Sequence, residues 1–385
     1  MLKVNLNLYL DVNEQYKVVI SDCHLSAGRY FEGKFNPHED FFFDQEMIEF
    51  FEYFSTGLYG DGGQGPVNVE LIINGDYLDF LNVPYLGEFE EGITEEIAMA
   101  KLEAIIAGHP RVMDALKKFA SKPNKKITYL IGNHDAELFF EKVRERITQL
   151  WDPEGQYPSE KVRLVADTDR LNYDHGLQIR HGNQFEASNQ LDFEQPFQEL
   201  PNGKKVLNIP WGSIYVLKII NRLKWERLNI DKIRPIKVFA FFGLLFDPVF
   251  TFRYLFLSLV YFLKTRIFGR MQNRFQVKNT FKMISQEGAL SQDLEREARE
   301  LLHSNPEVHT IVFGHTHLPM HRVYENGRQY LNSGTWTKMV YLDWRFMGEP
   351  PMRKTFVLVH LKNGEIKAEV NQWVGQKMPY QAHHS

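Results

Sequence analysis

Residues 69–80 read VELIINGDYLDF, an apolar run that ends in Gly75-Asp76. The run is typical of a buried strand, and the Gly-Asp pair places a carboxylate where the strand becomes a loop. Four further segments repeat this arrangement: Asp22-Cys23-His24 after VVIS, Gly132-Asn133-His134-Asp135 after TYLI, His181-Gly182 after LQIR, and Gly314-His315-Thr316-His317 after TIVF. Scaffolds that alternate strands and helices hold their active sites at such strand ends. The pattern therefore predicts an α/β fold whose polar segments gather in one site.

The potential ligands in these segments are Asp, Asn and His side chains, which supply oxygen and imidazole donors without thiolate. Each segment alone has an ordinary explanation, since Gly-Asp is a common turn and His181 alone would fit a hydrogen-bonded core histidine. All five together favour a site for Mn, Fe, Zn or Mg. Asp76 stands alone between two ligand segments and is the natural bridge between two cations. Two cations roughly 3.5–4 Å apart clamp the attacking and leaving oxygens of a displacement at phosphorus.

The five segments resemble the motifs of the calcineurin-like metallophosphoesterases, D-x-H, G-D, G-N-H-[DE], H and G-H-x-H, over about residues 17–335. The resemblance implies a four-layer αββα sandwich, in which two mixed sheets face each other between helices. It implies that one metal is held by Asp22, His24, Asp76 and His317, and the other by Asp76, Asn133, His181 and His315. The two divalent ions are expected to be Mn, with Fe, Zn, Co or Ni as alternatives.

The resemblance also implies a hydrolase that cuts phosphoester or pyrophosphate bonds by attack of a metal-bound hydroxide on phosphorus. His134 would be catalytic without binding a metal, because it would lie near the scissile phosphate and stabilise charge or protonate the leaving oxygen. Asp135 would orient His134 or its loop, or else cap a following helix. Asp79 lies one turn past Asp76 and either supports the site as an acceptor or only solvates a loop. Arg29 could reach a substrate phosphate.

The apolar pattern predicts strands that alternate with helices, followed by a late run of strands, which indicates an α/β fold with antiparallel additions. Strands are predicted at 17–21, 69–74, 127–131, 162–165, 177–181, 309–313, 329–332, 355–361 and 366–371. Helices are predicted near 44–54, 95–120, 137–150 and 290–303. The sequence ENGR at 325–328 predicts a hairpin turn.

The composition indicates a folded protein of a reducing compartment. The chain has 385 residues, of which 14% are aromatic, so a mostly disordered chain is excluded. The single cysteine, Cys23, cannot form an intramolecular disulfide. Residues 1–15 contain no basic-then-apolar signal peptide, so cytoplasmic residence is expected.

Charge is distributed unevenly along the chain. The net charge is −4, but residues 202–282 contain 16 Lys or Arg and 3 Asp or Glu. This basic stretch lies in the long gap between the His181 and Gly314 segments, where the family core needs only a short connection. We therefore expect residues 190–285 to form an inserted helical cap over the active site. Residues 1–189 and 286–385 would form the metallophosphoesterase domain.

Residues 238–263 are the most apolar stretch of the chain. A transmembrane helix is one interpretation, since about 20 apolar residues span a bilayer. Asp247 and Arg253 near the bilayer centre, and a helix break at Pro248, argue against it. Two shorter helices would instead lie in a membrane interface, bind acyl chains, or pack as core or dimer surface. Cations that could attract anionic lipid nearby are Lys204, Lys205, Lys218, Arg222, Lys224, Arg227, Lys232, Arg234 and Lys237, which favours a peripheral position on the inner face of a membrane.

The insertion guides the prediction of the substrate. The organisation resembles that of UDP-diacylglucosamine pyrophosphatases, which implies a lipid-linked pyrophosphate whose acyl chains the cap would hold. The chain departs from that type at His134, where Arg is typical, and at Asn183, where Asp is typical. Another lipid-linked phosphodiester or pyrophosphate is therefore an alternative. Further alternatives are a soluble phosphodiesterase or nuclease, a protein phosphatase, and a non-catalytic membrane-associated metal-binding scaffold. Nucleic acid is disfavoured because the acidic remainder of the chain repels a polyanion. The oligomeric state is not predicted.

Overall fold

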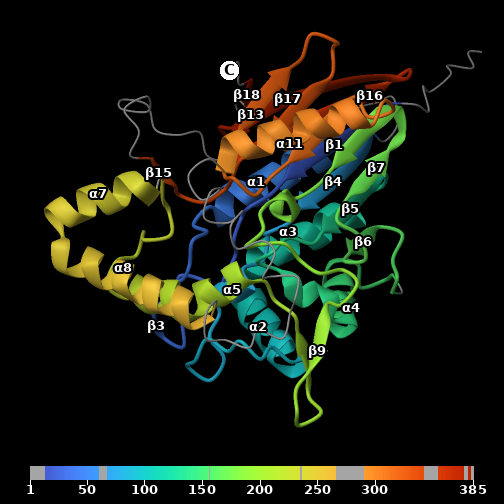
Figure 1. Ribbon diagram of the computed structural model, residues 1–385. Coiled ribbons are helices and arrows are strands. Elements are labelled where there is room, and N and C mark those ends of the chain that lie inside the picture. The colour runs from blue at the N-terminus through green and yellow to red at the C-terminus, as the bar shows by residue number, and fades with distance from the viewer. Residues whose placement is uncertain are drawn as a thin grey trace, which may run out of the picture.

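The computed structural model describes residues 14–59, 67–155, 157–234, 236–265, 290–341, 354–376 and 380–382. Its body has four layers, in which two β-sheets face each other and helices cover their outer surfaces (Figure 1). The apolar runs of the sequence form strands because sheets covered on both faces bury the side chains of both faces. The expected α/β sandwich is confirmed.

The larger sheet contains seven strands in the order β18-β17-β16-β1-β4-β5-β6. Their bounds are Gln15–Ile20 (β1), Asn68–Asn74 (β4), Lys125–Leu130 (β5), Val162–Val165 (β6), Thr355–Lys362 (β16), Glu365–Trp373 (β17) and Tyr380–Ala382 (β18). Strands β1, β4, β5 and β6 are parallel, so their carboxyl ends lie along one edge of the sheet. The first three of them lead directly into the segments of Asp22, Asp76 and Asn133.

The smaller sheet contains five strands in the order β13-β14-β12-β8-β7. Their bounds are Leu171–Tyr173 (β7), Leu177–Ile179 (β8), Thr310–Phe313 (β12), Met320–Val323 (β13) and Gln329–Asn332 (β14). Strands β8 and β12 are parallel neighbours and lead into the segments of His181 and Gly314. The predicted hairpin turn joins β13 to β14, with Gly327 at a φ of 74°.

A buried apolar layer holds the two sheets face to face. Val19 and Ile72 of the larger sheet and Ile179 and Val312 of the smaller sheet belong to one cluster and are all 0% exposed. Because these strands carry the ligand segments at their carboxyl ends, packing between the sheets also fixes the distance between those segments.

Helices α1 (Asp44–Ser55), α2 (Glu95–Gly108), α3 (Pro110–Ser121) and α4 (Glu141–Trp151) pack in the apolar layer of the larger sheet, and α11 (Leu290–Ser304) packs on the smaller one. The prediction of one helix over 95–120 was wrong. Pro110 lacks an amide hydrogen and disfavours a helical His109, whose ψ is 48°. The helix predicted at 137–150 begins later, at Glu141, after a 3-10 turn at Ala136–Phe139.

The segment predicted to be an insertion follows His181, and its described part contains both helices and strands. Its elements are β9 (Phe197–Glu199), β10 (Lys205–Leu207), α5 (Trp211–Tyr215), a π-helical turn (Val216–Ile220), α6 (Asn221–Lys224), β11 (Ile233–Arg234), α7 (Ile236–Phe246) and α8 (Pro248–Leu263). Strands β9 and β10 pair as an antiparallel hairpin within the predicted helical cap. Strand β11 pairs with β15 (Val340–Tyr341), while β2 (Tyr30–Phe31) pairs with β3 (Lys34–Phe35). The end expected at 285 lies outside the described residues.

A buried ion-pair network joins the predicted insertion to the body. Lys224 Nζ lies 2.9 Å from Asp40 Oδ2 and 2.7 Å from Asp231 Oδ2, and Lys232 Nζ lies 2.5 Å from Asp40 Oδ1. Both lysines are buried. The prediction that Lys224 and Lys232 attract anionic lipid was therefore wrong, because their ammonium groups face buried carboxylates.

The most apolar stretch of the chain forms two helices that break at Asp247-Pro248, as predicted, with Pro248 in the first turn of α8. Within the described ranges, no helix is both long enough and apolar enough to cross a bilayer. The two charged groups of this stretch have partners in the segment before it: Asp247 lies 2.6 Å from Arg227, and Arg253 pairs with Glu226. Helices α7 and α8 project to one side of the sandwich (Figure 1).

Candidate metal centre

The carboxyl ends of the parallel strands bring all five sequence-predicted segments together. The hydrogen bonds that join them run from His24 N to Asp76 O (3.0 Å), from His134 N to Asp76 Oδ1 (2.8 Å), from Gly314 N to His181 O (2.8 Å) and from His315 N to Asp22 Oδ2 (2.8 Å). The last bond crosses from the larger sheet to the smaller one. One site is therefore built from the ends of both sheets.

The backbone is strained at five of the predicted ligands. The φ angles are 52° at Asp22, 53° at His24, 51° at Asp76, 68° at His315 and 61° at His317. Residues other than glycine rarely adopt such values, and those that do gather at functional sites. Because the strained residues all belong to one group of side chains, the fold holds those side chains in place at a cost in backbone energy.

Glycines beside the ligands allow the loops to approach closely. A Cβ added to Gly75 would lie 2.4 Å from His181 Nδ1, and one added to Gly132 would lie 2.3 Å from Asp76 Oδ1. A Cβ at Gly314 would lie 2.7 Å from Asp22 Oδ2. These glycines leave the space in which the side chains meet.

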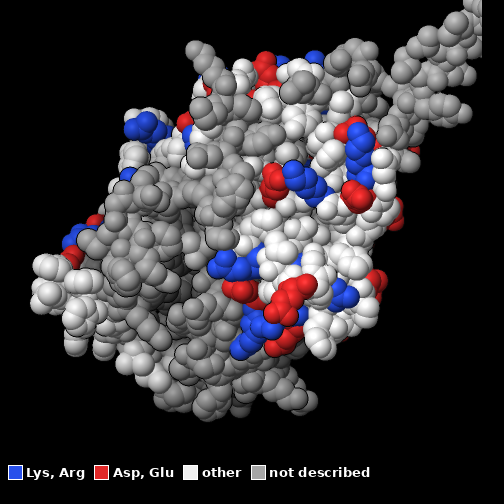
Figure 2. Space-filling view, turned by 90° about the horizontal axis from the view of Figure 1, so that it is seen from above, with Lys and Arg blue, Asp and Glu red and all other residues white. Residues whose placement is uncertain are grey.

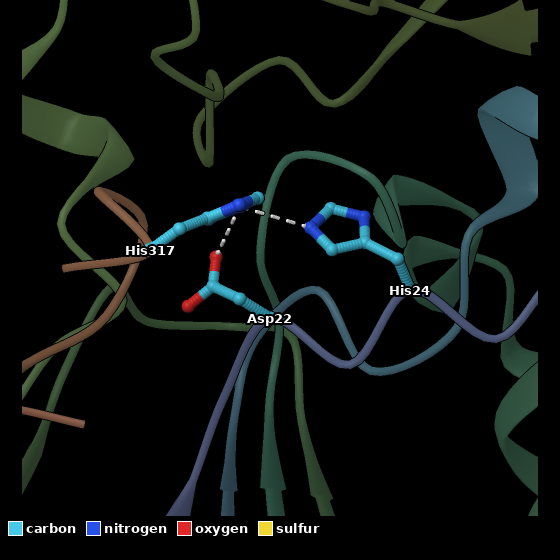
Figure 3. A group of neighbouring side chains, drawn as sticks. All are labelled: Asp22, His24 and His317. Atoms are coloured by element: carbon cyan, nitrogen blue, oxygen red, sulfur yellow. Dashed lines mark hydrogen bonds and ion pairs between the residues drawn. The ribbon is translucent and has the colours of Figure 1, made fainter. Parts of the chain in front are cut away.

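The described residues contain three groups of side chains that could each hold a metal ion: Asp22, His24 and His317; His24, Asp76 and His134; and Asp76, His181 and His315. In the first group the side chains point toward one another (Figure 3). His317 Nε2 lies 3.1 Å from His24 Nε2 and 3.3 Å from Asp22 Oδ1. In the third group, His181 Nε2 lies 3.1 Å from Asp76 Oδ2.

Several of these polar atoms are buried without a hydrogen bond within the described chain. They are Asp22 Oδ1, Asn133 Oδ1 and His181 Nε2. Buried polar atoms normally have a partner, so an unsatisfied one calls for an explanation such as a bound water or ion. All three belong to predicted metal ligands, so the donor set fits a pair of divalent cations.

The tautomers of two histidines also suit metal binding. His181 Nδ1 lies 2.7 Å from the carbonyl oxygen of Asn74, which can only accept a hydrogen bond. His24 Nδ1 lies 3.0 Å from Asp79 Oδ2. When each Nδ1 carries the proton, the lone pair of each neutral ring lies on Nε2, the nitrogen that faces the other candidate ligands.

The site strongly favours positive charge. Burial opposes the charge of Asp76, yet His181 and His134 hold the pKa of its carboxyl well below its ordinary range. Burial also opposes the charge of His134, but Asp79 and Asp76 raise its pKa to about 10. Burial is likewise outweighed at His181, where Asp76 and Asp22 raise the pKa to about 9. A dense set of carboxylates that draws protons to its histidines will also attract cations.

Asp79 holds two rings of the site at once. Its Oδ2 lies 3.0 Å from His24 Nδ1, and its Oδ1 lies 3.1 Å from His134 Nδ1. Asn82 donates to it twice, from its backbone N at 3.1 Å and from its side chain at 2.8 Å. Of the two roles considered for Asp79, these contacts are those of an acceptor that supports the site.

The carboxylate of Asp135 accepts hydrogen bonds from neighbouring segments of the site and not from the helical turn that follows it. Its Oδ2 accepts from Tyr129 Oη at 2.6 Å and from Tyr77 N at 3.2 Å, and its Oδ1 accepts from Gly132 N. It makes no side-chain hydrogen bond to the 3-10 turn that comes after it. Asp135 stands at the N-cap position of this turn without a side-chain capping bond, and its side-chain contacts are those of a residue that shapes the loop of His134.

Two residues remain to be placed: Arg29, which the sequence proposed, and Glu186, which it did not. Arg29 lies on the exposed surface after the Asp22 segment, and its proposed reach to a phosphate stays a prediction. Glu186 was missed: its Oε2 lies 2.6 Å from His315 Nε2. No motif spacing marks Glu186, because it meets His315 only when the two strand ends come together in the fold.

Comparison with known protein families identifies the family of the chain. The model of the calcineurin-like phosphoesterases matches residues 18–319. No curated protein sequence matches the chain. Similar solved structures include a dimetal phosphatase from Danio rerio (9% identity, 92% of this chain and 98% of that chain, TM-score 0.35) and a 5'-nucleotidase from Candida albicans (12%, 94% and 52%, TM-score 0.30). A third is vacuolar protein sorting 29 from Cryptosporidium parvum (12%, 97% and 97%, TM-score 0.31). Because these TM-scores are below 0.5, the family match alone assigns the chain.

Proposed function

Because the chain belongs to the calcineurin-like phosphoesterases, and is therefore a metal-dependent phosphoesterase, we propose that it hydrolyses a lipid-linked phosphoester or pyrophosphate at a membrane surface. The single observation that carries the lipid part is a pair of exposed apolar helices joined to the candidate metal centre. UDP-diacylglucosamine is one member of this class of substrate.

We propose the ligands of two divalent cations that the family resemblance implies, which the candidate groups of the site support in part. The first set comprises Asp22, His24, Asp76 and His317, and the second comprises Asp76, Asn133, His181 and His315. We propose that Asp76 serves both sets, because it lies near His24 in one candidate group and near His181 and His315 in another. We propose Mn, with Fe, Zn, Co or Ni as alternatives, because oxygen and imidazole donors accept all of these ions.

The chemistry that two bound cations supply is polarisation of the phosphoryl group and activation of a water molecule. The protein's own contribution lies in placement. Asp79 accepts from Nδ1 of His134 and so leaves Nε2 of that ring to face a substrate. A protonated His134 can stabilise the developing charge on the phosphate or give its proton to the leaving oxygen.

Helices α7 and α8 expose apolar side chains over much of their surface. The exposed fraction is 67% at Phe241, 77% at Phe246, 81% at Val249 and 69% at Phe252. This pair of helices forms the largely uncharged projection at the left of Figure 2. Monomeric proteins seldom leave large apolar patches in water, so the surface is suited to bind a lipid phase or acyl chains.

The exposed helices are connected to the metal centre through α5. Trp211 Nε1 donates to Thr265 Oγ1 at 3.0 Å, just beyond the end of α8. Two residues further along α5, Ser213 Oγ donates to the carbonyl oxygen of Asn133 at 3.4 Å. A substrate whose phosphate binds at the metal centre could therefore extend its acyl chains along α8 toward the projecting tip.

The charges around this surface also favour a membrane. Asp247, between α7 and α8, pairs with Arg227, and Arg253 of α8 pairs with Glu226, so these two charges leave the described apolar surface with little net charge. Lys264 follows α8 and is exposed, and residues 266–282 of the sequence add five Lys or Arg and no Asp or Glu. An apolar element with cations beside it matches the interface of an anionic membrane.

Two substrates in one Mn-containing buffer test the proposal: UDP-diacylglucosamine in mixed micelles and the small diester bis(4-nitrophenyl) phosphate. We expect a much higher kcat/KM for the lipid-linked pyrophosphate. Equal or faster turnover of the soluble diester would retain the phosphoesterase and reject this lipid substrate. Absence of turnover for both substrates, with metal bound, would favour the metal-binding scaffold.

A further inference from the structure

His315 has only one ring nitrogen left for a metal ion. Its Nε2 lies 2.6 Å from Oε2 of Glu186, and its backbone N donates to Asp22 Oδ2 at 2.8 Å. We propose that Glu186 is a positioning residue that fixes the proton of His315 on Nε2 and so makes Nδ1 the metal-binding atom. The inference rests on the proposed function, since it concerns one of the two assigned cations.

The Glu186 carboxylate is held from several sides. Ser188 Oγ donates to its Oε1 at 3.0 Å, and Asn189 Nδ2 donates to its Oε2 at 2.7 Å. The side chain is 14% exposed. A carboxylate fixed in this way offers His315 one acceptor in one direction, which selects both the tautomer and the ring orientation.

Glu186 is placed to act on a ligand rather than to be one. The candidate groups among the described residues include His315 with Asp76 and His181, and Glu186 belongs to none of them. A carboxylate behind a metal-binding imidazole increases the basicity of the ring, and its loss typically weakens metal binding 10–100-fold. That effect should fall on the cation held by Asp76, Asn133, His181 and His315.

The turn that holds Glu186 also supports the insertion. Gly212 N, at the start of α5, donates to Ser188 O at 2.8 Å. A Cβ added to Gly212 would lie 2.1 Å from Asn189 Oδ1, so α5 packs directly on this turn. Helix α5 therefore supports the turn of Glu186, the residue that orients His315. The metal site thus depends in part on α5, which lies outside the sandwich.

Metal binding by Glu186→Gln tests the inference. The purified full-length protein and its variants are equilibrated with buffered Mn²⁺ or Co²⁺, and bound metal and the visible Co²⁺ absorption are measured. We expect the wild type to hold two ions. E186Q should hold one with unchanged affinity and bind the other about 10–100-fold more weakly. The matched control is Glu199→Gln, an exposed glutamate of β9, which should bind as the wild type does.

A second variant separates positioning from general damage to the fold. If Glu186 acts through His315, then His315→Ala should weaken binding of the same cation. Adding E186Q to the His315→Ala variant should then reduce the metal affinity little further. Unchanged metal affinity and Co²⁺ absorption in E186Q would overturn the inference while leaving the phosphoesterase intact. Loss of both ions, or an additive loss in the double variant, would also overturn it. A wild-type protein that binds no metal would instead contradict the proposed function.

Discussion

The Asp79 carboxylate lies 3.1 Å from Nδ1 of His134 and thereby fixes a ring that faces the candidate metal centre. The same carboxylate binds His24, a proposed ligand, through its other oxygen. One buried side chain thus aligns the proposed acid with the metal site. This arrangement suggests that positioning and chemistry can be separated by substitution.

His134→Ala should retain both metal ions and lose about 10²–10⁴-fold in kcat, because the removed group is proposed to act only on the substrate. Metal content and kcat on the same preparation are the measurements. A fall in metal content would show that His134 is a ligand, which its place in a candidate group with His24 and Asp76 makes a real alternative.

Phe252→Glu combined with Phe256→Glu should release the protein from anionic vesicles. Both side chains are exposed on α8, so the substitutions add charge to its surface without opening a core cavity. Co-flotation with phosphatidylglycerol vesicles is the measurement. Val323→Glu is the matched control, since Val323 is 65% exposed on β13. Equal flotation of the double variant and the control would assign α7 and α8 to another partner.

Asp40→Asn should destabilise the protein by about 3–5 kcal/mol, the range found when one partner of a buried ion pair is removed. It would leave Lys224 and Lys232 buried with less compensating charge. Chemical denaturation measures the free energy of unfolding. Glu103→Gln is the control, because its exposed pair with Arg146 should contribute about 1 kcal/mol or less. A small effect at Asp40 would mean that the base of the insertion relaxes easily.

His109 should stabilise the protein only below alkaline pH. Burial would lower its pKa, but Asp44 and Glu39 raise it from the ordinary 6.5 to about 9. A raised folded-state pKa gives stability that is complete below pH 6.5 and is lost as the pH rises through 9. We therefore expect His109→Gln to cost on the order of 3 kcal/mol at pH 6 and much less at pH 10. A difference that does not change with pH would exclude the charged form.

The main strands and the ligand segments are predictable because apolar runs and motif spacing are local. The break at Asp247-Pro248 is predictable from proline chemistry, and Pro110 divides the helix expected over 95–120 for the same reason. Contacts between distant segments could not be predicted. In the sequence Lys224 is one cation of a basic run, yet its partner Asp40 lies far away in the chain. The role of Glu186 likewise could not be predicted, because its partner His315 comes from another strand end.

The most direct test of the central claim is a comparison of metal content and phosphodiester turnover between the wild type and Asp76→Asn. Asp76 is the one residue shared by both proposed ligand sets, and its carboxylate is buried among histidines. We predict two ions per wild-type chain, and in the variant a loss of metal together with a fall in kcat by orders of magnitude while the circular dichroism spectrum is preserved. A variant that keeps wild-type turnover would contradict the two-metal account.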